Sequence, residues 1–138
     1  MTTEKKLLTK LRENSRQSFA KISRELNISN STTIEKYQKI KPLIIKHTTL
    51  ANFSRFRQPI KTLMSITPID QEETIKWLSK RTELNNLYKT ANKNLLAETI
   101  FQTLKHKQEF IEEINQQGIL IMEEYYIIEE LKREETII

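Results

Sequence analysis

SFAKISRELNISNSTTIEKYQKIK, at residues 18–41, is the stretch that decides the fold of the first part of this 138-residue chain. Phe19, Ile22 and Leu26 recur at helical spacing and predict the apolar face of a short helix. The Asn-Ile-Ser segment at 27–29 breaks this period, because Asn tolerates the left-handed conformation that ends a helix and Ser is a good cap for the next one. The stretch therefore predicts two short helices joined by a tight polar turn, which is the pattern of a DNA-reading helix-turn-helix.

The second of these helices is expected at about residues 30–39, and its first turn offers small polar side chains. These are Asn30, Ser31, Thr32 and Thr33. Such side chains let a helix N-terminus approach base edges or phosphates closely. Its buried side is expected to consist of Ile34, Tyr37 and Ile40. Lys36 and Lys39 add positive charge, while Glu35 works against it.

Ahead of this pair, Leu7, Leu8 and Leu11 fall on one face of a helix expected at about residues 3–14, which would complete a trihelical core. Residues 1–49 carry eleven Lys/Arg against four acids, a net charge of +7, and residues 50–138 carry twelve against fourteen, a net charge of −2. This difference in net charge is expected when one lobe binds a polyanion and the other binds protein.

The composition excludes several classes of site. The chain has no Cys, which excludes disulfides and thiolate metal sites. No apolar run approaches the roughly 18 to 20 residues of a membrane helix. We therefore expect a cytoplasmic protein with no membrane partner.

Beyond Pro42 the pattern predicts a second, α+β lobe. The expected elements are an extended linker or strand at 43–53, a strand at 59–66, a helix at 70–80, strands at 86–90 and 95–102, a helix at 105–116 and a strand at 120–130. Asp70 and Glu73 form a capping-box pair, and Gly118, the only glycine, falls where a helix C-cap needs a left-handed residue. This order is the βαββαβ, ferredoxin-like arrangement with both helices on one face of the sheet.

The predicted organisation is a helix-turn-helix domain at 1–41, an interdomain strand or linker at 42–54 and a ferredoxin-like domain at 55–138. The helix-free face of the sheet would carry Leu63, Leu96, Ile100, Met122, Tyr126 and Ile128. Since a monomer seldom exposes so large an apolar patch, we expect this face to pair with a second copy as a homodimer.

This arrangement resembles the Lrp/AsnC family of archaeal and bacterial transcription regulators, whose second lobe is the RAM domain. The matching segments are LLTKLRENSRQSFAKISRELNISNSTT at 7–33, IIKHTTLANFSRF at 44–56, LYKTANKNLLAETIF at 87–101 and QQGILIMEEYYIIEELK at 116–132. The resemblance implies a regulator that binds double-stranded DNA as a dimer, tetramer or octamer, with recognition helices in successive major grooves roughly 34 Å apart. The DNA-binding residues implied are Ser18, Lys21, Asn30, Ser31, Thr32, Thr33, Lys36 and Lys39.

The chain departs from the family pattern at two places. The segment IKPLIIK, at 40–46, is shorter than the family's connection to the interdomain strand. The family's hairpin turn, which contributes to binding of a small effector that is often an amino acid, carries a glycine and two acidic positions. The effector-binding positions implied here are Thr90, Ala91, Asn92 and Asn94. Because the glycine and the acids are missing, we expect amino-acid sensing to be altered or absent, and no cofactor or metal is expected.

Three alternatives stay open at this point. One is a low-specificity, nucleoid-associated architectural protein without an effector. Another is an enzyme, since the two-lobe architecture also resembles the subunits of siroheme decarboxylase, but His47 and His106 are weak catalytic candidates and the pairs Glu112/Glu113 and Glu123/Glu124 are interpreted as solvent-side charge. The third is an interaction module whose helix-turn-helix has lost DNA binding. A non-enzymatic regulator is the preferred prediction.

Overall fold

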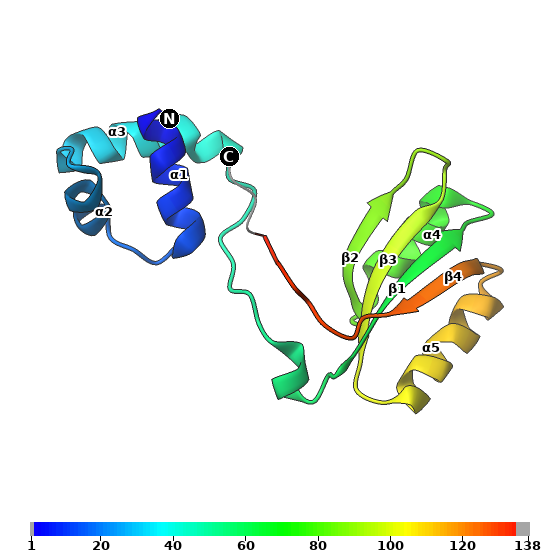
Figure 1. Cartoon of the computed structure of the whole chain (residues 1–138). Helices are drawn as coiled ribbons and strands as arrows, with labels where there is room; N and C mark the ends of the chain where they lie inside the picture. Colours follow the sequence, from blue (N-terminus) through cyan, green and yellow to red (C-terminus); the bar gives the residue numbers. More distant parts are fainter. Residues whose placement is uncertain (1, 135–138) are drawn as a thin grey trace. The chain divides into compact units, whose positions relative to one another are not determined.

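The computed structural model describes residues 2–134 of the chain (Figure 1). Contacts divide it into two compact units. The first unit is the chain up to Leu50 together with the chain from Lys132, and the second unit is Ala51–Leu131. Residues 135–138 of the predicted second domain lie outside the described residues.

The first unit is a bundle of three helices, α1 (Thr3–Glu13), α2 (Phe19–Leu26) and α3 (Asn30–Ile40). Its buried core consists of Leu7, Leu11, Ile22 and Ile40, with Leu8, Leu26, Tyr37 and Ile44 packed against them. The trihelical core predicted from the helical spacing is therefore confirmed.

The turn between α2 and α3 is built by the residues that predicted it. Asn27 ends α2 in the left-handed conformation, at φ 56°. Ser29 caps α3 by accepting a hydrogen bond from the backbone amide of Thr32 at 3.1 Å. These local contacts satisfy backbone groups that a helix end leaves unpaired.

The expectation for residues 43–53 was an extended linker or a strand, and the structure shows no strand there. A short 3-10 helix at Lys41–Leu43 follows α3, and a second one at Phe53–Phe56 precedes the sheet. Residues 44–52 form neither helix nor strand. A strand requires a neighbour that pairs with its backbone amides and carbonyls, and no described segment of this single chain pairs with residues 44–52.

The second unit is an antiparallel sheet with two helices. Its elements are β1 (Ile60–Thr67), α4 (Gln71–Ser79), β2 (Leu84–Lys89), β3 (Leu95–Phe101), α5 (Leu104–Gln116) and β4 (Leu120–Tyr126). The strand order is β2-β3-β1-β4, and each neighbouring pair is antiparallel. This is the predicted α+β, ferredoxin-like fold, in which both crossover helices cover the same face of the sheet.

The covered face of the sheet holds the main hydrophobic core. Its buried members are Met64, Ile66, Leu78, Leu95, Ala97, Phe101, Phe110, Ile114 and Ile119. Gly118 ends α5 at φ 72°, and the amide of Ile119 donates to the carbonyl of Ile114 at 3.3 Å. The lone glycine therefore takes the predicted C-cap position, where a left-handed residue lets the chain turn from α5 into β4.

The opposite face of the sheet, here called the open face, carries the side chains that alternate away from the core. Leu63, Leu96 and Ile100 lie on it as predicted, because their strand neighbours Met64, Ala97 and Phe101 are in the core. Tyr126 was expected there as well, but it pairs with the buried Thr62 and its hydroxyl contacts Lys107 of α5.

The cause is an irregularity in β4. Ser65 pairs with Glu123 whereas Ile66 pairs with Ile121, so Met122 is an extra residue in the ladder and the alternation shifts by one. Ile128, the remaining expected member, lies beyond the end of β4. The open face therefore receives Tyr125 in place of Tyr126.

Candidate nucleic-acid interface

One side of α3 is free of the three-helix core. The exposed residues of this helix are Asn30, Ser31, Ile34, Glu35, Gln38 and Lys39. They recur at spacings of three and four residues and therefore form one continuous face, here called the outward face of α3. Ile34 was expected on the buried side, but 41% of its surface is exposed. The helix is rotated relative to the prediction, because Thr33 takes the buried position.

Thr33 is fully buried, which contradicts the expectation that it contacts DNA. Its hydroxyl donates to the backbone carbonyl of Ser29 at 3.1 Å. The hydroxyls of Ser31 and Thr32 also lie within hydrogen-bond distance of the Ser29 hydroxyl, at 3.1 and 2.7 Å. The small polar residues at the start of α3 thus stabilise the turn, and Asn30 and Ser31 remain on its exposed side.

The four acids of residues 2–49 form ion pairs with three lysines. Lys36 bonds Glu4 at 2.9 Å, Lys39 pairs with Glu35 at 3.4 Å, and Lys10 contacts both Glu13 and Glu25. The hydrogen bond from Lys36 lowers the pKa of Glu4, and the same bond raises the pKa of Lys36. Lys36 and Lys39, both expected to meet phosphates, are therefore already paired within the protein.

Other cations of residues 2–49 make no ion pair with a described residue. They are Lys5, Lys6, Arg12, Arg16, Lys21, Arg24, Lys41 and Lys46. Lys21 is exposed at the start of α2, next to Ser18, whose hydroxyl accepts a bond from the Lys21 amide. A helix N-terminus and a lysine without an ion-pair partner among the described residues are both groups that attract phosphate.

The hairpin between β2 and β3 is closed by its own polar groups. The Thr90 hydroxyl contacts the side chain of Asn92 and the carbonyl of Asn94, and the Asn94 side chain accepts a bond from Thr67 at 3.1 Å. Lys93 adopts the left-handed conformation at φ 65°, a role that the sequence pattern did not reveal. Ala91 contributes only a methyl group. The four predicted effector positions therefore lie together, with three of their side chains already hydrogen-bonded.

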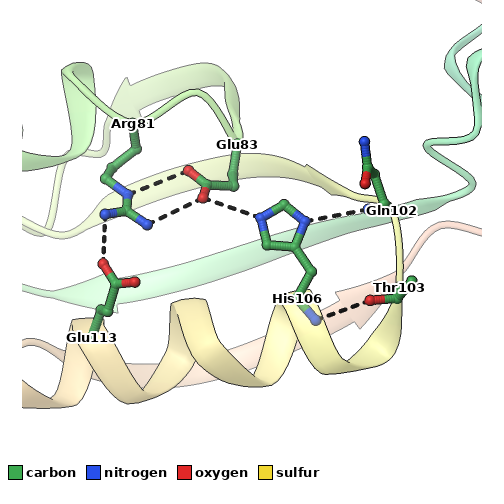
Figure 2. A network of polar contacts seen from close by, with 6 residues as sticks. All are labelled: Arg81, Glu83, Gln102, Thr103, His106 and Glu113. Atoms are coloured by element: carbon green, nitrogen blue, oxygen red, sulfur yellow. Dashed lines mark hydrogen bonds and ion pairs between the residues drawn. The ribbon is translucent and has the colours of Figure 1, made fainter.

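His106 belongs to a structural network of the second unit (Figure 2). Its Nε2 lies 3.2 Å from Glu83, and its Nδ1 accepts a bond from the Gln102 amide at 3.4 Å, so both ring nitrogens are engaged. Arg81 bonds Glu83 and reaches Glu113 on α5. Burial raises the pKa of Glu83, but hydrogen bonds from its own amide, from His106 and from Arg81 bring the pKa below its usual value.

The paired acidic side chains do not form a metal site. Glu113 and Glu124, interpreted from the sequence as solvent-side charge, are ion-paired with Arg81 and Lys107. Among the described residues there is no cluster of three His, Cys, Asp or Glu side chains suited to a metal ion. His47 lies exposed in the linker. Within residues 2–134, no helix has the length and apolar character needed to cross a membrane.

Comparison with solved structures identifies the fold. A transcriptional regulator from Neisseria meningitidis in complex with L-methionine superposes with a TM-score of 0.86 at 14% identity, covering 96% of this chain and 92% of that one. LrpC of B. subtilis gives 0.85 at 14% identity over 97% and 99%. A feast or famine regulatory protein from M. tuberculosis, complexed with L-methionine, gives 0.85 at 12% identity over 95% and 93%. No protein-family model and no curated protein matches the sequence. The chain thus has the complete two-lobe fold of the Lrp/AsnC regulators.

Proposed function

We propose, from the fold that this chain shares with the Lrp/AsnC transcription regulators, that it binds double-stranded DNA as a dimer and regulates transcription. The observation that carries the proposal is the outward face of α3, which is exposed, continuous and rich in side chains that read bases. The surplus of cations in residues 2–49 that make no ion pair with a described residue supports the proposal, because phosphate contacts supply much of the affinity for DNA.

The outward face of α3 also suggests which side chains carry sequence specificity. The side-chain amide of Gln38 is suited to a pair of hydrogen bonds with adenine, and the carboxylate of Glu35 is suited to accepting one from the cytosine amino group. Ile34 provides an apolar surface for a thymine methyl. Asn30 and Ser31 lie at the N-terminal end of the helix, which enters the groove first. We assign base reading to these five residues, and we assign the positioning of the helix to the buried Thr33 and the half-buried Thr32.

Phosphate binding is assigned to Ser18 and Lys21 at the start of α2. Lys21 has no ion-pair partner among the described residues, so it can bind a phosphate without breaking an ion pair. Lys36 and Lys39 would first have to break their ion pairs with Glu4 and Glu35. The latter two lysines are therefore weaker contributors to the attraction for DNA than the sequence pattern suggested.

Dimerisation is assigned to the open face of the sheet. Exposed hydrophobic side chains, among them Tyr88, Leu120 and Tyr125, surround the predicted members Leu63 and Leu96. A second copy would remove this apolar surface from water and bring two copies of α3 onto one duplex. Tetramers and octamers would follow from further contacts of the same unit.

The hairpin at residues 90–94 is assigned a structural role. An amino-acid ligand carries an ammonium group that requires an acceptor such as a carboxylate, and residues 84–97 contain no acid. We therefore propose that the hairpin of this chain does not bind an amino acid. Two of the neighbours were solved in complex with L-methionine. The second unit does not support the enzyme alternative, because both ring nitrogens of His106 are hydrogen-bonded within the network around Glu83.

The decisive experiment is selection of bound duplexes from a random library, at near-physiological salt, followed by sequencing. Enrichment of a near-palindromic motif with half-sites about one helical turn apart would support the proposal. DNA recovered without a motif would favour the architectural alternative. Failure to recover DNA would contradict DNA binding and direct attention to protein partners.

A paired set of variants links the motif to α3. Ile34→Ala combined with Gln38→Ala changes only the outward face, so the enriched motif should change or disappear. Leu104→Ala combined with Gln108→Ala makes the same chemical change at exposed positions of α5 and should leave the motif intact. An unchanged motif in the α3 variant would contradict the assignment of base reading.

A further inference from the structure

The chain contains a long acid-free stretch that the predicted sites did not include. Between Glu35 and Asp70 there is no acidic residue, and seven Lys/Arg occur in this interval. They are Lys36, Lys39, Lys41, Lys46, Arg55, Arg57 and Lys61. The stretch begins in α3 and continues through the linker to β1.

The structure separates these cations into two groups. Lys36 and Lys39 are paired within the first unit, and Lys61 contacts Glu98 at 3.2 Å and Glu130 at 2.8 Å. The others make no ion pair with a described residue. Of these, Lys46, Arg55 and Arg57 are exposed within residues 44–58, here called the linker segment.

The backbone of the linker segment presents these side chains in two ways. Lys46 lies in residues 44–52, which have no regular structure. Arg55 and Arg57 lie in and directly after the short helix at Phe53–Phe56, with Arg57 in the left-handed conformation at φ 61°. Both arginines flank Phe56, which is 70% exposed. The segment thus places one exposed cation in irregular backbone and two more at a compact turn.

A polyanion is the partner that this charge pattern fits. A duplex carries one negative charge per roughly 1.7 Å of its axis. Closely spaced cations can therefore bind phosphates wherever the protein lies along the base sequence. The outward face of α3 does not supply this attraction itself, because Glu35 offsets Lys39. Attraction to the backbone must therefore come from cations outside that face.

The chain length places the start of the segment near the proposed DNA site. Lys46 follows Ile40, the last residue of α3, by six positions, so its Cα lies within about 22 Å of the helix end in any linker conformation. This span is shorter than one turn of DNA, which rises about 34 Å. Lys46 consequently stays within reach of the duplex that α3 would contact.

We propose that the linker segment is a second DNA contact, in which Lys46, Arg55 and Arg57 bind phosphates of the DNA backbone. The proposal rests on the proposed function, since it requires that the protein bind DNA. It adds an interaction surface outside the helix-turn-helix, and that surface contributes affinity that does not depend on sequence.

The salt dependence of DNA binding tests the proposal. The variant Lys46→Gln/Arg55→Gln/Arg57→Gln is compared with Lys80→Gln/Lys89→Gln/Lys105→Gln, which removes the same charge at exposed positions that make no ion pair with a described residue. Binding to a mixed-sequence duplex is measured by fluorescence anisotropy over a series of NaCl concentrations. Each lost phosphate contact lowers the slope of log K against log salt by about 0.9, so the linker variant should lose about 2.7 per protomer.

The outcomes separate the two proposals. A smaller slope for the linker variant, with the control unchanged, supports the second contact. A linker variant with the wild-type slope, or two variants with the same reduced slope, overturns the second contact but leaves the proposed function standing. A wild-type protein that binds no duplex overturns both.

Proximity can be measured directly because the chain has no cysteine. Thr49→Cys, in the linker segment, and Ser79→Cys, at the end of α4, each provide one attachment point for an iron chelate that cleaves nearby DNA. Both positions are exposed. Cleavage from position 49 well above that from position 79 is expected, and equal cleavage from both would contradict the second contact.

Discussion

At the scale of single residues, the backbone conformation at Gly118 sets the cost of replacing the only glycine in the sequence. Gly118 has a φ of 72°, and an added Cβ would lie 3.4 Å from Ile69 Cδ1, which is ordinary van der Waals contact. The cost of a side chain there comes from the left-handed backbone and not from crowding. We expect Gly118→Ala to lower the free energy of unfolding by about 1 to 2 kcal/mol.

Chemical denaturation of the full chain measures this effect. Gly118→Asn provides the matched comparison, because Asn tolerates the left-handed region, as Asn27 does at the end of α2. It should lose clearly less stability than Gly118→Ala. Equal losses for both variants would indicate that the contact with Ile69, and not the backbone, sets the cost.

Glu83 gives the second unit an acid-sensitive site. Its pKa is lowered on folding, so its contribution to stability is present above the ordinary value of 4.5 and is lost as the pH falls through the folded-state pKa. Glu83→Gln should lower the stability at neutral pH and flatten the decline below about pH 4.5. Urea unfolding at neutral pH and at about pH 3 tests this expectation. Glu112→Gln, on the exposed side of α5, should follow the wild-type curve.

At the scale of elements, the sequence predicted what is determined by near neighbours along the chain. The caps at Ser18, Ser29 and Asp70 are confirmed because each acts on an amide three residues away. The rotation of α3 was predicted incorrectly, because Thr33 is buried through contacts made in three dimensions by the other helices. An apolar Ile34 outside the core and a threonine inside it reverse the usual pattern of a helix face.

The strands show the same limit. The order of strands and helices was predictable from periodicity, but the extra residue at Met122 was not, and it moved Tyr126 from the expected face to the other. The linker shows a related limit, since the sequence left a strand or an extended linker open and strand pairing depends on a neighbour that the local sequence does not specify. The closed hairpin at residues 90–94 also depended on Thr67, which lies on a different strand.

The pairing of Lys36 with α1 leads to a prediction about α2 and α3, the two helices that are proposed to contact DNA. Lys36 is ion-paired with Glu4, so the charge of this lysine is partly compensated in the free protein. The exposed Lys21 has no ion-pair partner among the described residues. Lys21→Gln should therefore reduce the salt slope of duplex binding by about 0.9 per contact, and Lys36→Gln should reduce it by less. Anisotropy titrations at several salt concentrations compare the two. A larger effect for Lys36→Gln than for Lys21→Gln would support the phosphate contact that was expected for Lys36 from the sequence.

At the scale of the whole molecule, the open face combines apolar surface with a polar network that is complete within one chain. Glu98 accepts hydrogen bonds from Asn85 at 3.0 Å and Asn86 at 2.9 Å, and it pairs with Lys61 at 3.2 Å. Burial raises the pKa of Glu98, but these hydrogen bonds lower it below its usual value. A network whose members already have partners can be covered by a second chain without leaving a buried group unsatisfied.

A charge placed on the open face should prevent dimerisation. Leu96 lies on β3 opposite Tyr88 and is flanked by the polar network, so Leu96→Glu would bury two uncompensated carboxylates in each dimer. Sedimentation velocity should show the variant as a monomer at concentrations where the wild type is a dimer, with an unchanged circular dichroism spectrum. Leu104→Glu, at a site on α5 that is 64% exposed, makes the same change away from the open face and should remain dimeric.

Because a monomer carries only one recognition helix, Leu96→Glu should also bind a two-half-site duplex more weakly than Leu104→Glu does. A dimeric Leu96→Glu variant would exclude the open face as the subunit interface.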